Sequence, residues 1–179
     1  MMAIKILVEP DNEPVTLAEA KVWMRVDQSI EDSLINGLIR TARMHIEAII
    51  GRAMITQTIQ QTSTAQTNTG IIDLLIAPVQ SVLIVAKINA DGSENILAVS
   101  DYQVDIDNNR IAVGIIETGS AFRLEYIAGY GALASSVPEA LRTAILSQTA
   151  RLFEHRDGEA VGISHSVQSL LSPFARVRL

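Results

Sequence analysis

The sequence predicts an α+β fold made of an N-terminal helical pair, a central antiparallel β region, a C-terminal helix and an extended tail. Apolar residues recur at helical spacing toward both ends of the chain, whereas short apolar or alternating runs between turn residues fill its middle. Because these strand-like runs do not alternate with helices, their order argues against a parallel doubly wound sheet.

The two N-terminal helices are marked by start and stop signals. The residues at 16–19, TLAE, form a capping box, and the first helix is expected to run to about Val26. The second begins near Ser29 and ends at Gly51, a residue suited to a left-handed helix end. Its apolar stripe consists of Ile35, Leu38, Ile39, Ala42, Ile46, Ile49 and Ile50.

The middle of the chain predicts short strands separated by turns. A small polar loop is expected at 64–70, and turns are expected at 91–92 and 107–109. The strands expected between these breaks cover 55–62, 71–76, 82–88, 102–106, 111–113 and 122–126.

A third helix follows the β region. It begins near 136–139, where Pro138 fits the first turn, and it ends near 155–158. Gln148 interrupts its inward stripe. The apolar members of that stripe are Leu141, Ala144, Ile145 and Leu152.

The charge of the chain is acidic and unevenly distributed. The formal net charge of −6 argues against free duplex DNA as the main ligand, because phosphate binding needs clustered Lys and Arg. Residues 1–136 carry nine basic and sixteen acidic side chains. After Glu159 there is no acid, while Arg176 and Arg178 remain.

The absence of cysteine removes disulfides, thiolate metal sites and cysteine nucleophiles together. The first residues lack the long apolar run of a signal peptide, and no stretch has the length and apolar character of a membrane span. We expect a soluble protein that is made in the cytoplasm and does not bind membranes.

No catalytic residue, metal site or cofactor is predicted. The histidines His45, His155 and His165 have no histidine one helical turn away, and a histidine at a helix end is explained by the helix dipole. The D-x-D-x-N pattern at 105–109 resembles the start of a calcium loop, but Arg110 and Ile116 stand where Gly and a bidentate Glu are required. We therefore expect a β-turn there.

The C-terminal segment is the strongest candidate for a functional site. We assign 1–163 to a single α+β domain and 164–179 to a tail. The tail is either a last strand or short helix folded onto its own domain, or an arm that docks into another chain. Its apolar and basic residues are Val167, Leu170, Leu171, Pro173, Phe174, Arg176, Val177, Arg178 and Leu179.

Several short phrases, taken in order, resemble the head–tail connector (adaptor) proteins of long-tailed phages, prophages and gene transfer agents. The resemblance extends over nearly the whole chain, and its specificity comes from the ordered combination. The phrases are VTLAEAK at 15–21, DSLI at 32–35, GR at 51–52, ITQT at 55–58, AGYG at 128–131, VPEAL at 137–141 and LFEHR at 152–156.

The resemblance implies a structural, non-enzymatic role in the neck of a virion or phage-like particle. Family members form a homo-oligomeric ring, commonly a dodecamer, that binds the portal protein, extends the DNA channel and presents a platform to a stopper or another neck protein. DNA is expected to pass without specific binding, since an acidic body repels phosphate. The tail would bind the portal through Leu170, Leu171, Phe174, Arg176, Arg178 and Leu179.

Two other functions stay open at this point. One is a different ring protein of the neck or tail, such as a stopper or tail terminator. The other is a metal-dependent hydrolase whose site is built from scattered carboxylates, although nothing in the sequence singles out two of them for acid–base chemistry.

Overall fold

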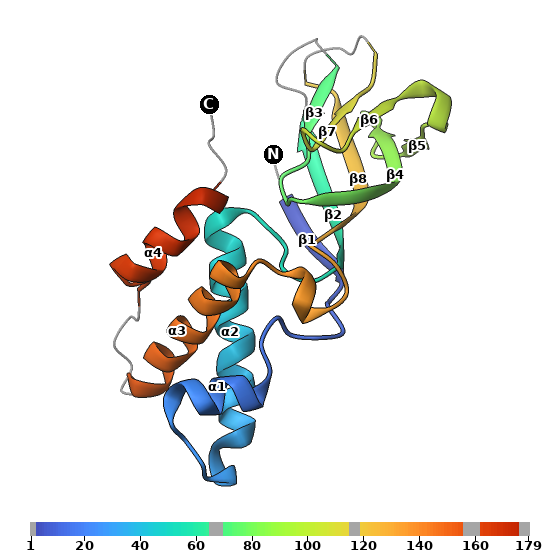
Figure 1. Ribbon diagram of the computed structural model, residues 1–179. Coiled ribbons are helices and arrows are strands. Elements are labelled where there is room, and N and C mark those ends of the chain that lie inside the picture. Colours follow the sequence, from blue (N-terminus) through green and yellow to red (C-terminus); the bar gives the residue numbers. More distant parts are fainter. Residues whose placement is uncertain (1–2, 65–69, 115–118, 156–161, 176–179) are drawn as a thin grey trace. The chain divides into compact units, whose positions relative to one another are not determined.

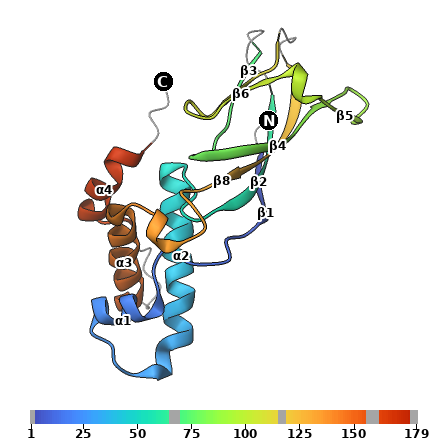
Figure 2. The same ribbon diagram turned by 45° about the vertical axis from the view of Figure 1, so that its right-hand side comes forward.

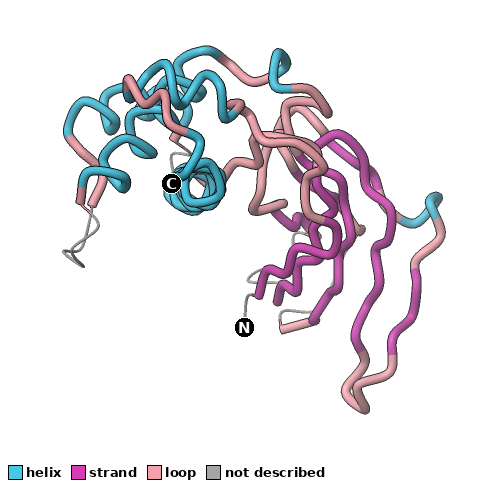
Figure 3. The backbone as a smooth tube through the Cα atoms, turned by 90° about the horizontal axis from the view of Figure 1, so that it is seen from below, coloured by secondary structure: helices cyan, strands magenta, loops and turns pink. Residues whose placement is uncertain are grey.

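The computed structural model describes residues 3–64, 70–114, 119–155 and 162–175 (Figure 1). The chain divides into two compact units. The strand unit comprises Met1–Pro10 and Thr56–Tyr130, and the helical unit comprises Asp11–Ile55 and Gly131–Leu179. Figure 3 shows that the strands belong to the first unit and the α-helices to the second. The predicted α+β class is confirmed, whereas the domain boundary at 163 stays a prediction.

The helical unit is built from four α-helices (Figure 2). Helices α1, α2 and α3 pack against one another, and α4 packs against α3. None of the helices within the described residues has the length and apolar character required to cross a membrane. The helices are α1 (Leu17–Met24), α2 (Asp32–Ile50), α3 (Glu139–Glu154) and α4 (His165–Leu171).

The ends of α1 and α2 follow the expected signals with small shifts. Helix α1 ends at Met24, slightly before the predicted end at Val26, and Arg25 caps it in a left-handed conformation with φ 57°. A short 3-10 turn at Ser29–Glu31 then leads into α2. Gly51 closes α2 in the left-handed conformation predicted for it, with φ 66° and its N–H donating to the carbonyl of Glu47.

The apolar stripes of α2 and α3 form the core of the helical unit. Burial of such stripes, rather than helix propensity alone, stabilises helices in proteins. Two members of the predicted α2 stripe behave differently from the rest, because Ile49 is exposed and Leu38 is only half-buried. The fully buried members are Ile35, Ile39, Ala42, Ile46 and Ile50 of α2 and Leu141, Ala144 and Ile145 of α3.

The main sheet of the strand unit has five strands in the order β1-β2-β8-β4-β5, and every neighbouring pair is antiparallel. Strand β1 was not predicted from the sequence. All six of its residues are exposed, so it lacks the alternation of buried and exposed positions that marks a half-buried strand. The strands are β1 (Ala3–Val8), β2 (Gln57–Thr64), β4 (Val79–Ile88), β5 (Glu94–Ile96) and β8 (Ala121–Ala128).

Strands β2 and β8 carry the core face of this sheet. Alternate residues of both strands are buried, as the period of a β-strand requires. Gln61 is a polar member of this face, and it is fully buried. Its amide donates to the carbonyl of Asp73 (2.8 Å) and accepts from the N–H of Leu75 (2.8 Å) and the hydroxyl of Tyr126 (3.1 Å). These bonds join the sheet to the segment that follows β3.

A second sheet of three strands has the order β3-β7-β6, formed by Ile71–Asp73, Arg110–Ala112 and Gln103–Asp105. The turn between β6 and β7 places Asn109 in the left-handed region with φ 52°. Its side-chain oxygen accepts from the N–H of Val79 (3.0 Å), and its carbonyl accepts from the N–H of Leu74 (2.8 Å). This turn therefore fixes the small sheet to the start of β4.

A close backbone approach makes Gly70 necessary beside the small sheet. Its φ is +71°, and its carbonyl accepts from the N–H of Val113 (2.8 Å). A Cβ atom at this position would lie 1.6 Å from the carbonyl oxygen of Gly114. Only glycine satisfies both the backbone conformation and the space.

We predict that Gly70→Ala lowers the free energy of unfolding by about 2 kcal/mol, because the backbone must move to admit the methyl group. The matched control is Gly37→Ala in the interior of α2, where a Cβ would meet nothing within 4 Å. That change should raise stability by about 0.5–1 kcal/mol through helix propensity. Urea unfolding of both variants measures the two values, and equal effects of the same sign would contradict the argument.

Candidate functional site

The predicted tail begins with a short helix, α4, that is capped and partly buried. The Ser164 hydroxyl accepts from the N–H of Val167 (3.3 Å), which caps the helix start. Val167 and Leu171 are 0% and 3% exposed, and α4 packs on α3. The first part of the tail is therefore a component of the helical unit. This agrees with one of the two alternatives from the sequence, a short helix folded onto its own domain.

The chain after α4 is held by its backbone. The Arg52 side chain, just beyond the end of α2, donates through Nε to the carbonyl of Phe174 (2.6 Å). The N–H of Ala175 donates to the carbonyl of Leu171 (3.1 Å), across the 3-10 turn Ser172–Phe174. The path of the tail is thus fixed as far as residue 175.

The six residues predicted to bind a portal fall into three groups. Leu171 is buried in the helical unit, whereas Leu170 and Phe174 are half-buried and present part of their apolar surface to solvent. Arg176, Arg178 and Leu179 lie outside the described residues. Their proposed role stays a prediction.

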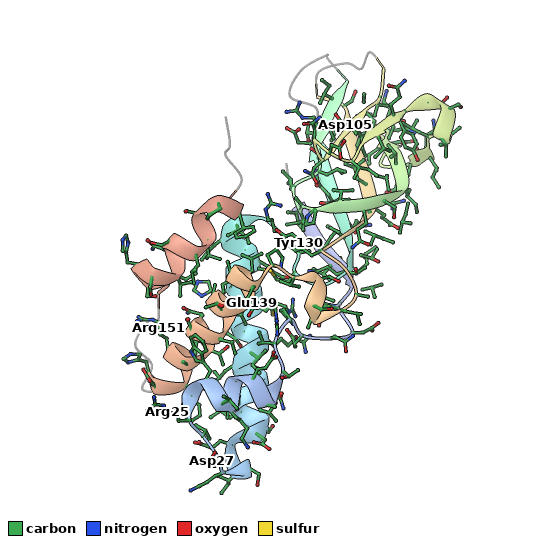
Figure 4. All side chains as sticks on the ribbon, in the orientation of Figure 1. Arg25, Asp27, Asp105, Tyr130, Glu139 and Arg151 are labelled. Atoms are coloured by element: carbon green, nitrogen blue, oxygen red, sulfur yellow. The ribbon has the colours of Figure 1, made fainter. Side chains whose placement is uncertain are left out.

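Arg142 of α3 joins two segments that are distant in sequence. The guanidinium donates to the carbonyl of Pro14 (3.0 Å), to the carboxylate of Glu139 (2.8 Å) and to the carboxylate of Glu19. Figure 4 labels Glu139 at the start of α3. The contact therefore fixes α3 against the start of α1.

The predicted capping box is present and shares Glu19 with Arg142. The N–H and hydroxyl of Thr16 donate to Glu19 Oε2 (2.7 and 2.9 Å), and the Thr16 hydroxyl accepts from the N–H of Glu19 (3.2 Å). The backbone hydrogen bond from Thr16 is the main reason that the pKa of Glu19 lies below its ordinary value, with Arg142 adding to the effect. The sequence predicts the capping box, but it does not show that Glu19 also binds Arg142.

A second, more deeply buried cluster surrounds Arg43 of α2, which is only 2% exposed. Its guanidinium donates to Glu13 through Nε (2.7 Å) and Nη2 (3.3 Å) and to Glu47 through Nη1 (2.7 Å). The other oxygen of Glu47 accepts from the N–H of Met54 (2.7 Å). The spacing of Arg43 and Glu47 on one helix was readable from the sequence, whereas Glu13 and Met54 give no such signal.

Burial raises the pKa of Glu47 above its ordinary value, and the charge of Arg43 together with the Met54 N–H opposes that rise. A carboxyl group with a raised pKa in the folded state makes its full contribution to folding stability at pH values below its unfolded pKa. That contribution is lost as the pH rises through the folded pKa. Arg43 is therefore what makes an ionised Glu47 acceptable in the interior near neutral pH.

The side chains that the sequence offers as metal ligands, the three histidines and the carboxylates near 105–109, do not form a metal site within the described residues. His155 and His165 are exposed, and His45 is half-buried. The carboxylate of Asp105 accepts from the N–H of Asn108 (3.1 Å) and its amide (2.7 Å), which is the β-turn expected in place of a calcium loop (Figure 4). Over the described ranges, no group of three or more His, Cys, Asp or Glu side chains is arranged to hold a metal ion.

Comparison with protein families places the chain in one of them. The family described as phage gp6-like head-tail connector protein matches residues 14–118, which is more than half of the chain. The chain belongs to this family. The match starts at Pro14, whose carbonyl Arg142 binds, and it includes α1, α2 with Arg43 and Glu47, and strands β2 to β7. Connector membership makes this a structural protein of the head–tail connector family.

Solved structures share the fold of this connector over its whole length. A chain in the neck of an empty gene transfer agent particle, computed with C6 symmetry, is 24% identical with a TM-score of 0.80, covering 99% of this chain and 97% of that one. A chain in the virion of a native gene transfer agent particle is 22% identical with a TM-score of 0.78, covering 98% and 96%. A chain in the neck of a native particle, computed with C12 symmetry, is 23% identical with a TM-score of 0.78, covering 99% and 97%. No curated protein matches the sequence.

We predict that Arg43→Met lowers the free energy of unfolding of the connector by about 3–5 kcal/mol at pH 7, because it leaves the buried carboxylate of Glu47 without the charge of Arg43. Removing the guanidinium raises the pKa of Glu47 further above its ordinary value, so part of the loss should be regained as the pH falls below 7 and the buried carboxylate takes up a proton. Urea unfolding at several pH values measures this dependence.

The matched control is Arg40→Met, which removes an exposed arginine from the same helix and should change stability by no more than about 0.5 kcal/mol. A loss in Arg43→Met that is the same at pH 7 and pH 5 would contradict the role assigned to Glu47.

Proposed function

We propose that this connector is the ring-forming adaptor subunit of a phage or phage-like particle. The ring, a dodecamer, binds the portal protein, extends the DNA channel and carries a stopper or another neck protein on its far side. The subunit acts without catalysis or cofactor, is assembled in the bacterial cytoplasm and functions in the particle neck. The observation that carries the proposal is the connector-family match over 14–118.

The geometry of the tail supports portal binding. Helix α4 and the bond from Arg52 to the Phe174 carbonyl hold the segment up to residue 175, so the last four residues start from a fixed point. Those residues are Arg-Val-Arg-Leu and contain no acid. An apolar and basic peptide on a rigid base loses less conformational entropy on binding than one on a flexible linker.

The distribution of charge supports a DNA channel that does not retain DNA. The body of the chain is acidic, and the net charge of the whole chain is −6. Duplex DNA binds through clustered Lys and Arg that displace counterions from its phosphates. Many basic side chains in the described residues are instead engaged by carboxylates, including Arg43, Arg110, Arg123 and Arg142.

The structural neighbours support a ring of identical subunits. Chains with this fold occur in the necks of gene transfer agent particles computed with C6 and C12 symmetry. Closed rings require a heterologous interface, in which one surface of a subunit contacts a different surface of the next.

We predict that deleting residues 176–179 reduces portal binding at least tenfold while the free energy of unfolding changes by no more than about 0.5 kcal/mol, because α4 is left in place. Deleting 164–179 should also abolish binding, but it removes Val167 and Leu171 from the helical unit and so lowers stability as well. Binding to purified portal rings and thermal unfolding measure the two effects separately.

The matched control is Val167→Ala, which should lower stability by about 1–3 kcal/mol and leave portal binding intact. Unchanged portal binding by both deletions would reject the proposed role of the tail. Electron microscopy of the neck distinguishes this adaptor from a stopper or tail terminator, since only the adaptor ring touches the portal.

A further inference from the structure

Strand β1 is an exposed apolar edge. Within the described residues it pairs only with β2, so one side of its backbone is open. Ile4 and Ile6 are 46% and 39% exposed, and Leu7 and Val8 are also exposed. An edge of this kind is a template for pairing with another strand unless it is covered.

The strand register shows that this edge continues the core of the sheet. Ile4 stands opposite Gln61 and Ile6 stands opposite Ile59 on β2. Directly opposed residues of an antiparallel pair point to the same face, and Gln61 and Ile59 are 0% and 1% exposed. Ile4 and Ile6 are therefore core-face residues that no part of the described chain covers fully.

The opposite edge of the same sheet is β5, and in the part of the chain that the structure describes it pairs only with β4. All three of its residues, Glu94–Ile96, are exposed, and Ile96 is 63% exposed. They pair with Ala86–Ile88, at one end of the longer strand β4. The sheet thus ends in an exposed edge on both sides, and each edge carries at least one exposed isoleucine.

The two edges differ in charge. Between Ala3 and Val8 the only charged residue is Lys5. The segment 89–101, which contains β5, carries Asp91, Glu94 and Asp101 and no basic residue. Glu94 is paired with Arg123 of β8 (2.7 Å), so the acidic character of this edge comes from Asp91 and Asp101. A basic edge facing an acidic edge is attracted to it, whereas two copies of either edge repel each other.

We propose that the β1 edge (Ala3–Val8) of one subunit pairs with the β5 edge (Glu94–Ile96) of the next, so that the sheets of neighbouring copies join. This inference rests on the proposed ring and names the surfaces that build it. The two edges are different surfaces of one chain, as a heterologous contact requires. Because neighbouring strands in the sheet alternate in direction, β1 and β5 run the same way, and a small rotation between copies brings them together in parallel.

The register of this contact is limited by irregularities in β1. A bulge lies between Ile6 and Val8, and Pro10 follows the strand. Both features restrict regular pairing to a short stretch centred on Lys5. This stretch matches the short length of β5 and prevents the longer pairing that leads to aggregation.

The chain has no cysteine, so disulfide cross-linking tests the contact without background. Three strands separate β1 from β5, which places the two edges about 19 Å apart across one sheet at the usual strand spacing. That separation exceeds the roughly 7 Å limit between Cα atoms joined by a disulfide. In the double variant Lys5→Cys/Ile96→Cys, whose two positions lie on the same face of the sheet by the strand register, a disulfide must therefore join two copies.

Mild oxidation of this double variant in assembled rings should give a ladder of covalent multimers, because each subunit carries both halves of the contact. The control double variant Lys5→Cys/Ile30→Cys, with Ile30 exposed in the helical unit, should stay monomeric on a denaturing gel. Rings that assemble with normal mass but give no ladder would overturn the inference and leave the proposed function intact. Dimers from Lys5→Cys alone, or a cross-link from it to portal or another neck protein, would also overturn it.

A second measurement does not depend on cysteine. Ile6→Thr and Ile96→Thr keep a β-branched side chain and should shift ring assembly to at least tenfold higher protein concentration, with unfolding of the monomer little changed. Ile30→Thr, the matched control, should assemble as the unaltered chain does. Equal weakening of ring assembly by all three substitutions, or weakening by Ile30→Thr only, overturns the proposed edge contact. A chain that forms no ring with or without portal would instead reject the proposed function, and the inference with it.

Discussion

The buried guanidinium of Arg43 is the constraint on which the helical unit depends. It binds Glu13, which precedes α1, and Glu47, which lies one turn further along α2, and Glu47 in turn accepts from the backbone of Met54. A charge this deeply buried is tolerated only when its partners satisfy it fully. The Arg43 side chain therefore fixes the segment before α1 to α2, and through Glu47 it also fixes the segment after α2. The apolar stripes of the helical unit pack in this arrangement.

The phrases that resembled the connector family acquire a physical meaning in the structure. The phrases at 15–21 and 137–141 lie far apart in sequence, yet Arg142 joins their neighbourhoods through Pro14, Glu19 and Glu139. The phrase at 51–52 supplies Gly51, which closes α2, and Arg52, which holds the base of the tail. These three phrases therefore supply helix ends and the contacts between them.

Local signals in the sequence predicted much of the fold. The capping box at Thr16, the helix end at Gly51 and the alternation along β8 depend on neighbours within a few residues, and all three are present. Strand β1 escaped prediction because its residues do not alternate between buried and exposed positions, and α4 was expected only as one of two alternatives because a helix of seven residues has too few turns to show a period. The partners of Arg43 and Arg142 depend on the tertiary fold, which no spacing along the chain reveals.

The bond between Arg52 and the carbonyl of Phe174 has a consequence for how connectors diversify. Every residue type offers a backbone carbonyl, so the hydrogen bond places no demand on the side chain at 174. This hydrogen bond can therefore be kept while the sequence after residue 175 changes to bind a different partner. Natural variation should therefore be tolerated at the docking end and resisted at Arg52, which separates the evolution of partner choice from the evolution of the scaffold.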